Sequence, residues 1–120
     1  MANSAAYVPL GDDTVTLQNG HHTAAVFKFS APDVDPGRKS VLSFVADPFG
    51  DNTVSLEWDL NGTNILTESF NTPQARALQE IVGKDLLKEH GNELKVRVTD
   101  TDNSGSIKID DVVLMYTQKA

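Results

Sequence analysis

The sequence predicts an all-β fold, an antiparallel β-sandwich of the jelly-roll type with about eight strands. Three observations support this fold class. Glycines and prolines punctuate the chain at the spacing of roughly eight to twelve residues that turns have in sandwiches and barrels. Asn-Gly pairs at 19–20 and 61–62 lie between apolar runs, and both residue types tolerate the positive φ of a type I′ hairpin turn. Several runs alternate apolar and polar residues with the period of two that a half-buried strand shows.

The first third of the chain contains two expected strands around a turn, then a loop and a buried strand. Residues 14–18 (TVTLQ) and 21–29 (HHTAAVFKF) flank the first Asn-Gly pair, so we expect them to form a hairpin. Residues 31–40 contain two prolines, one glycine and four charged residues, which predicts a long surface connection. Residues 41–46 (VLSFVA) are apolar at positions of both faces and favour a central strand.

Two runs further along the chain show the alternation of strands with one wet face. Residues 94–98 alternate apolar and basic residues, and residues 54–60 alternate apolar residues with polar ones before the second Asn-Gly turn. The apolar face of the earlier run comprises Val54, Leu56, Trp58 and Leu60. Trp58 is therefore expected in the core rather than as a platform for a sugar ring. Phe49 is the better candidate for an exposed aromatic ring, although we expect it to be tucked under its loop.

Residues 73–90 allow two interpretations. Pro73 could be the first residue of a helix, and Leu78, Ile81 and Val82 have helical spacing. Gly83 then interrupts the helical pattern. The alternative is a strand over 76–82 followed by a short turn at 84–87, and this is the interpretation that we favour.

Composition restricts the class of function. A chain of 120 residues has room for one domain, 1–120, with one core. The net charge of −7, from 10 basic and 17 acidic residues, argues against a nucleic-acid surface and against docking on an anionic membrane. The absence of cysteine excludes disulfides and thiolate metal sites. The start of the sequence has no signal-peptide pattern, and no apolar run approaches the ~20 residues that span a bilayer.

The segment 100–111 resembles a calcium loop of the EF-hand or dockerin type. Calcium takes about six to eight oxygen ligands, and such a loop supplies them from fixed positions around a sharp glycine turn. Here Gly105 stands at the turn position. The ligand positions are Asp100, Asp102, Ser104, Ser106 and Asp111. The segment before the loop looks like a strand where an EF-hand has a helix, so a plain polar turn stays open as the alternative.

The alternation of the last expected strand gives a second argument about the segment 100–111. It places Asp111 on one face with Ile107, Ile109, Val113 and Met115. A carboxylate among inward-facing residues must be paired, coordinated or neutralised. A structural calcium ion would satisfy Asp111, and so would a β-bulge at Asp110-Asp111 that turns its side chain outward.

The last third of the chain resembles a known family. Residues 86–98 (LLKEHGNELKVRV) are followed by 105–116 (GSIKIDDVVLMY), and together they resemble the closing strands of galactose-binding-like jelly-roll modules. Residues 54–61 are similar to the strand that ends in Leu-Asn-Gly in those modules. The resemblance implies an accessory, non-catalytic binding module whose ligand is most often a carbohydrate. No ligand-binding motif of that family can be transferred residue by residue.

Catalytic patterns are absent from the sequence. Serine and threonine occur in no nucleophile motif, and Glu57 and Asp59 are acids on the wet face of a strand. His21, His22 and His90 are interpreted as solvated residues. We therefore predict a binding module rather than an enzyme, with a small jelly-roll enzyme as one alternative and a structural or protein-interaction module as the other. An extracellular location is favoured if the ligand is a sugar, and the sequence does not indicate an oligomeric state.

Overall fold

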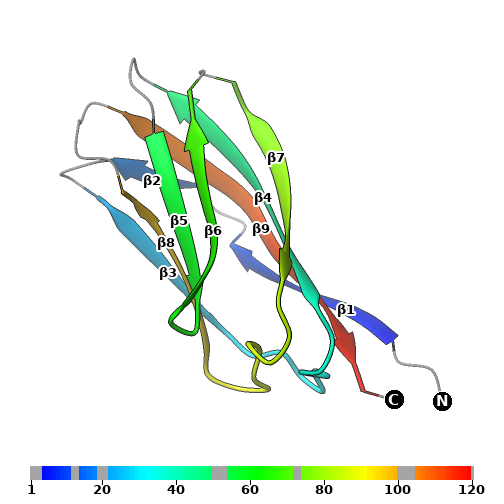
Figure 1. The fold of residues 1–120 in the computed structure, drawn as a ribbon. Helices are drawn as coiled ribbons and strands as arrows, with labels where there is room; N and C mark the ends of the chain where they lie inside the picture. Colours follow the sequence, from blue (N-terminus) through cyan, green and yellow to red (C-terminus); the bar gives the residue numbers. More distant parts are fainter. Residues whose placement is uncertain are drawn as a thin grey trace.

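The computed structural model describes residues 4–11, 14–18, 22–49, 54–71, 74–99 and 105–119. Within these residues the chain forms nine strands and no helix (Figure 1). The strands are β1 (Ser4–Gly11), β2 (Val15–Gln18), β3 (Ala24–Phe29), β4 (Ser40–Phe49), β5 (Val54–Leu60), β6 (Thr63–Phe70), β7 (Arg76–Val82), β8 (Asn92–Val98) and β9 (Ser106–Gln118). No helix long and apolar enough to cross a bilayer occurs among the described residues.

The strands form two antiparallel sheets that pack face to face. The first sheet has the order β1-β9-β4-β7, and the second has the order β3-β8-β5-β6. β2 pairs with the stretch of β9 that β1 leaves free, so β1 and β2 together line one edge of β9. This architecture confirms the predicted jelly-roll sandwich. β4 lies between β9 and β7, as expected of a strand that is apolar on both faces.

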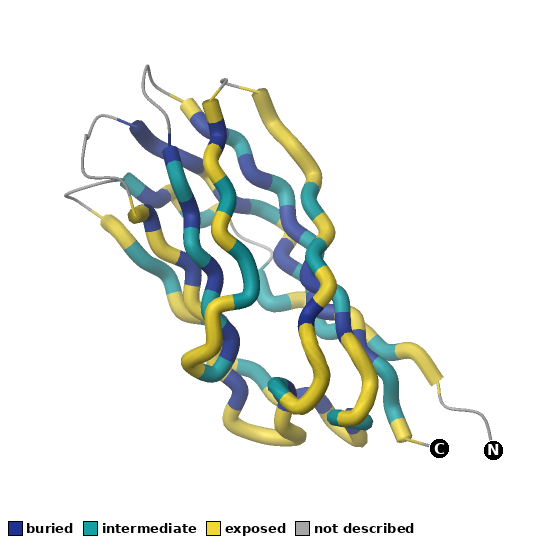
Figure 2. Tube along the Cα trace, viewed as in Figure 1, coloured by how far each residue is buried: buried dark blue, intermediate teal, exposed yellow. Residues whose placement is uncertain are grey.

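The core lies between the two sheets and follows the predicted alternation. In β5 and β8 every second residue is buried (Figure 2). Trp58 has 0% of its surface exposed, and its ring lies 4.6 Å from that of Phe44 at an interplanar angle of 39°. The two rings join the facing sheets at the centre of the core, so the interpretation of Trp58 as a core residue is confirmed.

The second Asn-Gly pair forms the predicted hairpin turn. Asn61 and Gly62 have φ values of 50° and 86°, as a type I′ turn requires, and Leu60 pairs with Thr63 across them. Residues 76–82 form β7 and are followed by a short turn. This confirms the strand interpretation of the segment 73–90.

The first predicted hairpin is wrong beyond one residue pair. The Asn-Gly turn at 19–20 lies outside the described residues. Gln18 and His22 do pair around it, with backbone N···O distances of 2.8 and 3.2 Å. Beyond this pair β2 continues along β9 in the first sheet, whereas β3 continues along β8 in the second sheet. The chain reverses direction here and also crosses from one sheet to the other.

A β-bulge at Asp111 corrects the predicted faces of the last strand. Asp111 has φ 52°, and the pairing of β4 with β9 shifts by one residue there. Because a bulge inserts one extra residue, the alternation changes face after it. Val112, Leu114 and Tyr116 are therefore buried in place of Val113 and Met115. The side chain of Asp111 is exposed, which is the bulge alternative of the sequence analysis.

Candidate functional site

Three connections gather at one end of the sandwich, the lower end in Figure 1. They are the β5–β6 turn, the β3–β4 connection and the β7–β8 connection. Backbone hydrogen bonds tie the last two together, from Ala31 N to Glu89 O at 2.9 Å and from Asp85 N to Pro36 O at 2.7 Å. These cross-links fix the loops against one another, so the surface that they form is largely set before any ligand arrives.

Two amides, the buried Asn92 and the half-buried Asn61, hold the β7–β8 connection to the β5–β6 turn. Asn92 is 1% exposed. Its Nδ2 donates to Lys88 O at 2.6 Å, and its Oδ1 accepts from Lys88 N at 2.9 Å and from Asn61 Nδ2 at 3.0 Å. Asn61 Nδ2 also donates to Leu86 O at 2.7 Å, and Asn61 Oδ1 accepts from Glu93 N at 2.8 Å. The side chains of the two amides thereby satisfy backbone groups of the loop that have no strand partner.

A cleft of about 480 Å³ has Asn61 of this amide pair in its lining, and we call it the Glu93 cleft. Four charged residues are among those that line it, the acids Asp59 and Glu93 and the lysines Lys88 and Lys95. Gly91 forms part of the wall with φ 72°, a conformation that strains any residue with a Cβ. Carboxylates accept hydrogen bonds and ammonium groups donate them. The cleft therefore offers both partners that a hydroxyl group needs.

A second cleft of about 470 Å³ adjoins the first and shares Gly91 and Glu93 with it. It adds Lys28 and the half-buried Phe29, so an aromatic surface lies next to the polar groups of the Glu93 cleft. Ligand sites in proteins combine apolar surface with a few placed polar groups in this way.

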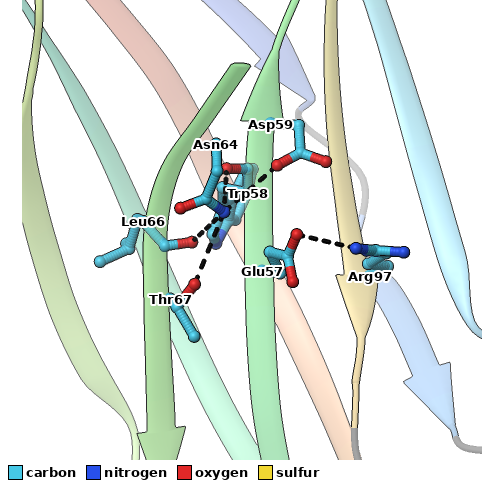
Figure 3. Close-up of polar contacts among 7 residues, drawn as sticks. All are labelled: Glu57, Trp58, Asp59, Asn64, Leu66, Thr67 and Arg97. Carbon is cyan, nitrogen blue, oxygen red and sulfur yellow. Dashed lines mark hydrogen bonds and ion pairs between the residues drawn. The ribbon is translucent and has the colours of Figure 1, made fainter. Parts of the chain in front are cut away.

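Further polar groups continue along the outer face of the second sheet, beyond the Glu93 cleft (Figure 3). Asp59 Oδ1 accepts a hydrogen bond from Asn64 Nδ2 at 3.2 Å. Glu57 Oε1 accepts one from Arg97 at 2.7 Å, and this contact raises the pKa of the Arg97 guanidinium. The paired Glu57 is thus an ion-pair partner, and its arrangement gives no support to an acid-base role.

One of the predicted calcium ligands, Asp111, lies too far from another, Ser106, to bind the same ion. Asp100, Asp102 and Ser104 lie outside the described residues. Ser106 and Asp111 both lie within β9, where five residues span roughly 16 Å, far more than the coordination sphere of one ion. Asp111 therefore cannot share an ion with Ser106. In the described part of the chain, no three His, Cys, Asp or Glu side chains lie close enough to hold a metal.

One aromatic side chain, Phe49, differs from its predicted state, and a second, Tyr7, has an exposure for which no prediction was made. Phe49 is the last residue of β4 rather than part of a loop, and it is 40% exposed. Lys108 Nζ lies 5.2 Å from its ring centroid. Tyr7 is 72% exposed, and the sequence analysis did not select it. The sequence pattern that could have indicated this exposure is the alternation of residues 4–10 (SAAYVPL), in which Tyr7 falls on the face opposite to Ala6 and Val8.

Tyr7 belongs to an apolar row across the outer face of the first sheet. Tyr7 pairs with Met115, Met115 with Val41, and Val41 with Ile81. Ile81 is 64% exposed and Met115 is 37% exposed. The two outer faces of the sandwich therefore differ, since the first sheet presents apolar groups here and the second sheet presents charged ones.

The fold is that of carbohydrate-binding-module β-sandwiches. No protein-family model matches the chain, and no curated protein matches its sequence. Among solved structures, the chain is similar to dimeric latent PorU from Porphyromonas gingivalis, with a TM-score of 0.72 and 10% identity over 99% of this chain. It spans only 13% of the PorU chain, so the likeness concerns one part of a much longer protein.

Two xylan-related modules also match. The first is the CBM36-1 domain of a multidomain xylanase from the hindgut metagenome of Trinervitermes trinervoides, with a TM-score of 0.59 and 12% identity over 98% of this chain and all of that one. The second is a CBM36 module in complex with calcium and xylotriose, with a TM-score of 0.50 and 14% identity over 94% and 99% of the two chains. At these identities the likeness establishes the fold.

Proposed function

We propose that this chain is a non-catalytic carbohydrate-binding module whose sugar site is the Glu93 cleft. The observation that supports the proposal most is the set of polar and charged residues that line this cleft. Asp59, Glu93, Lys88 and Lys95 line the cleft together with Asn61, whose side chain is hydrogen-bonded to the buried Asn92. Sugar hydroxyls act as donors and acceptors at once, so a cleft with both kinds of partner matches them. The structural neighbours named as carbohydrate-binding modules support the same class of ligand.

The first test is a screen of neutral oligosaccharides by affinity gel and isothermal titration, starting with xylo-oligosaccharides. Glu93→Ala should lower the affinity for a bound glycan about tenfold or more, because each hydrogen bond to a charged group contributes about 1.5–3 kcal/mol. The exposed position of Glu93 on β8 means that the variant should keep its fold, which circular dichroism would check.

Tyr7→Ala is the matched control, since an exposed ring is the usual platform for a pyranose and Tyr7 is the most exposed of the large apolar residues in the described part of the chain. We expect this variant to bind as the parent does. If Tyr7→Ala abolishes binding and Glu93→Ala does not, the sugar site lies on the apolar row of the first sheet. If no glycan is retained at all, the interaction-module alternative replaces the proposal, and the apolar row is then its natural contact surface.

We also propose one structural calcium ion, held by Asp100, Asp102 and Ser104 together with a group at Ser106. The spacing of these residues supports it, as does the calcium of the CBM36 complex with xylotriose. Binding to the native state alone stabilises by about 2.7 kcal/mol at ~100 Kd of free ion. Millimolar calcium added after EDTA treatment should therefore raise the melting temperature by several degrees.

Two variants test the ligand set of this ion. Asp102→Ala should abolish the calcium-dependent rise in melting temperature. Asp111→Asn should preserve it, because the exposed Asp111 lies too far along β9 to reach the ion and Asn accepts the positive φ of the bulge. Loss of the rise in Asp111→Asn would restore the full EF-hand-like ligand set. A melting curve that calcium leaves unmoved in the parent protein would show that the segment is a polar turn.

A further inference from the structure

A third cleft lies at the same end of the sandwich as the Glu93 cleft and differs from it in charge. It has a volume of about 420 Å³ and is lined by Gly37, Arg38, Lys39, Lys84 and Thr117, and we call it the Lys84 cleft. Three of these residues are cationic, and the described lining contains no carboxylate. In a chain of net charge −7, three cations around one hollow are an unusual concentration of positive charge.

The walls of the Lys84 cleft come from three segments that are tied together. Asp35 N donates to Thr117 O at 2.8 Å, which joins the β3–β4 connection to β9. Asp85 N donates to Pro36 O at 2.7 Å, which joins the β7–β8 connection to the same loop. These two hydrogen bonds therefore hold the backbone segments that carry Arg38, Lys39 and Lys84 close to one another.

Nearby acids compensate this charge only in part. Asp35 Oδ1 accepts a hydrogen bond from Gly37 N at 3.1 Å, and Asp35 Oδ2 lies 3.9 Å from Arg38 Nε. Asp35 thus forms an ion pair with Arg38 at the edge of the cluster. Within the described residues, no ion pair or hydrogen bond of the ammonium groups of Lys39 and Lys84 is found. An anion placed between them would gain charge-assisted hydrogen bonds from both.

We propose that the Lys84 cleft binds an oxyanion, and specifically the sulfate ester or carboxylate of an acidic glycan. The net charge of the chain disfavours polyanions such as nucleic acid, which need an extended basic surface, whereas a single substituent needs only this local cluster. The proposal rests on the proposed function in one respect, the choice of a glycan as the carrier of the anion. The Glu93 cleft would then hold neutral sugar groups while the Lys84 cleft selects for charge.

The test is a titration followed by backbone amide NMR, with inorganic sulfate, a galacturonate oligosaccharide and a neutral xylo-oligosaccharide as probes. Sulfate and galacturonate should each give saturable shifts at residues 37–39, 84 and 117, and the affinity should fall as salt is added. The Lys39→Gln/Lys84→Gln double variant should weaken both anions about tenfold or more. An Arg76→Gln/Lys108→Gln double variant, with the same change in net charge outside the cleft, should bind both anions as the parent does.

Each outcome separates this proposal from the proposed function. Galacturonate shifts confined to residues 37–39, 84 and 117, without any binding of neutral glycans, would support the anion site in the Lys84 cleft and contradict the neutral sugar site in the Glu93 cleft. Neutral binding at the Glu93 cleft with no saturable anion shifts would do the reverse. Equal weakening in the two double variants, or shifts spread over all basic residues, would show that the anions respond to overall charge and would overturn the proposal.

Discussion

Trp58→Ala should destabilise the protein more than any other single change considered, by about 3–5 kcal/mol. The side chain is completely buried and lies against Phe44 between the two sheets, so its removal leaves a large cavity that neighbouring strands cannot fill by small shifts. Since domains of this size are stable by only about 5–15 kcal/mol, the melting temperature should fall by about 10 °C or more. Thermal and urea unfolding followed by circular dichroism would measure the loss.

Two further variants define the cause of this loss. Trp58→Phe keeps a ring against Phe44 and should cost only about 1–2 kcal/mol. Among the described residues the Trp58 Nε1–H is buried without a hydrogen-bond partner, and phenylalanine removes that unsatisfied donor. Tyr7→Ala deletes an exposed ring and should change the stability by less than about 0.5 kcal/mol. A Trp58→Ala protein as stable as Tyr7→Ala would contradict the assigned core.

The features that the sequence predicted correctly depend on neighbouring residues. The type I′ turn at Asn61-Gly62 needs only two residues that accept positive φ, and the faces of β5 and β8 follow from the geometric alternation of a strand. The extended form of 76–82 was decided by Gly83, which breaks the helical pattern. In each of these cases the signal lies within about ten residues of the structure that it predicts.

The features that were predicted wrongly depend on partners distant in the sequence. The turn between β2 and β3 looked like a hairpin, but which sheet each strand joins is decided by β9 and β8. The bulge at Asp111 reverses the faces of half of β9, and a period of two cannot reveal one inserted residue. The hint was the carboxylate that the regular alternation placed among inward-facing residues, and on that ground a bulge at Asp110-Asp111 was kept open as the alternative to a calcium ion.

The candidate sites were the hardest part to predict. Asp59 and Lys88 meet in one cleft, although 28 residues lie between them in the chain, and Lys39 and Lys84 are further apart still. Each of these residues taken alone looks like an ordinary solvated charge. Lys39 and Lys84 are grouped by the hydrogen bonds between the β3–β4 and β7–β8 connections, and Asp59 and Lys88 by the hydrogen bonds of Asn61 and Asn92. No local sequence pattern indicates either set of bonds.

Asn92→Ala should be the most damaging substitution of a polar residue, with a loss of about 2–3 kcal/mol. The side chain is buried and makes hydrogen bonds of 2.6, 2.9 and 3.0 Å to the backbone of Lys88 and to Asn61. Alanine would leave the Lys88 amide and carbonyl without these partners in a partly buried position. Because the same bonds shape the Glu93 cleft, the variant should also bind the glycan more weakly than the parent does.

Asn64→Ala is the matched control for this prediction. Asn64 is also an amide of the second sheet, on β6, but it is exposed, and its Nδ2 lies 3.2–3.5 Å from its four acceptors (Figure 3). Its removal should cost less than about 1 kcal/mol. Hydrogen exchange should show faster exchange of the Lys88 amide in Asn92→Ala and little change there in Asn64→Ala. Equal losses of stability in the two variants would mean that the Asn61–Asn92 pair does not hold the loop. The Glu93 cleft would then be shaped by the backbone hydrogen bonds between Ala31 and Glu89 and between Asp85 and Pro36.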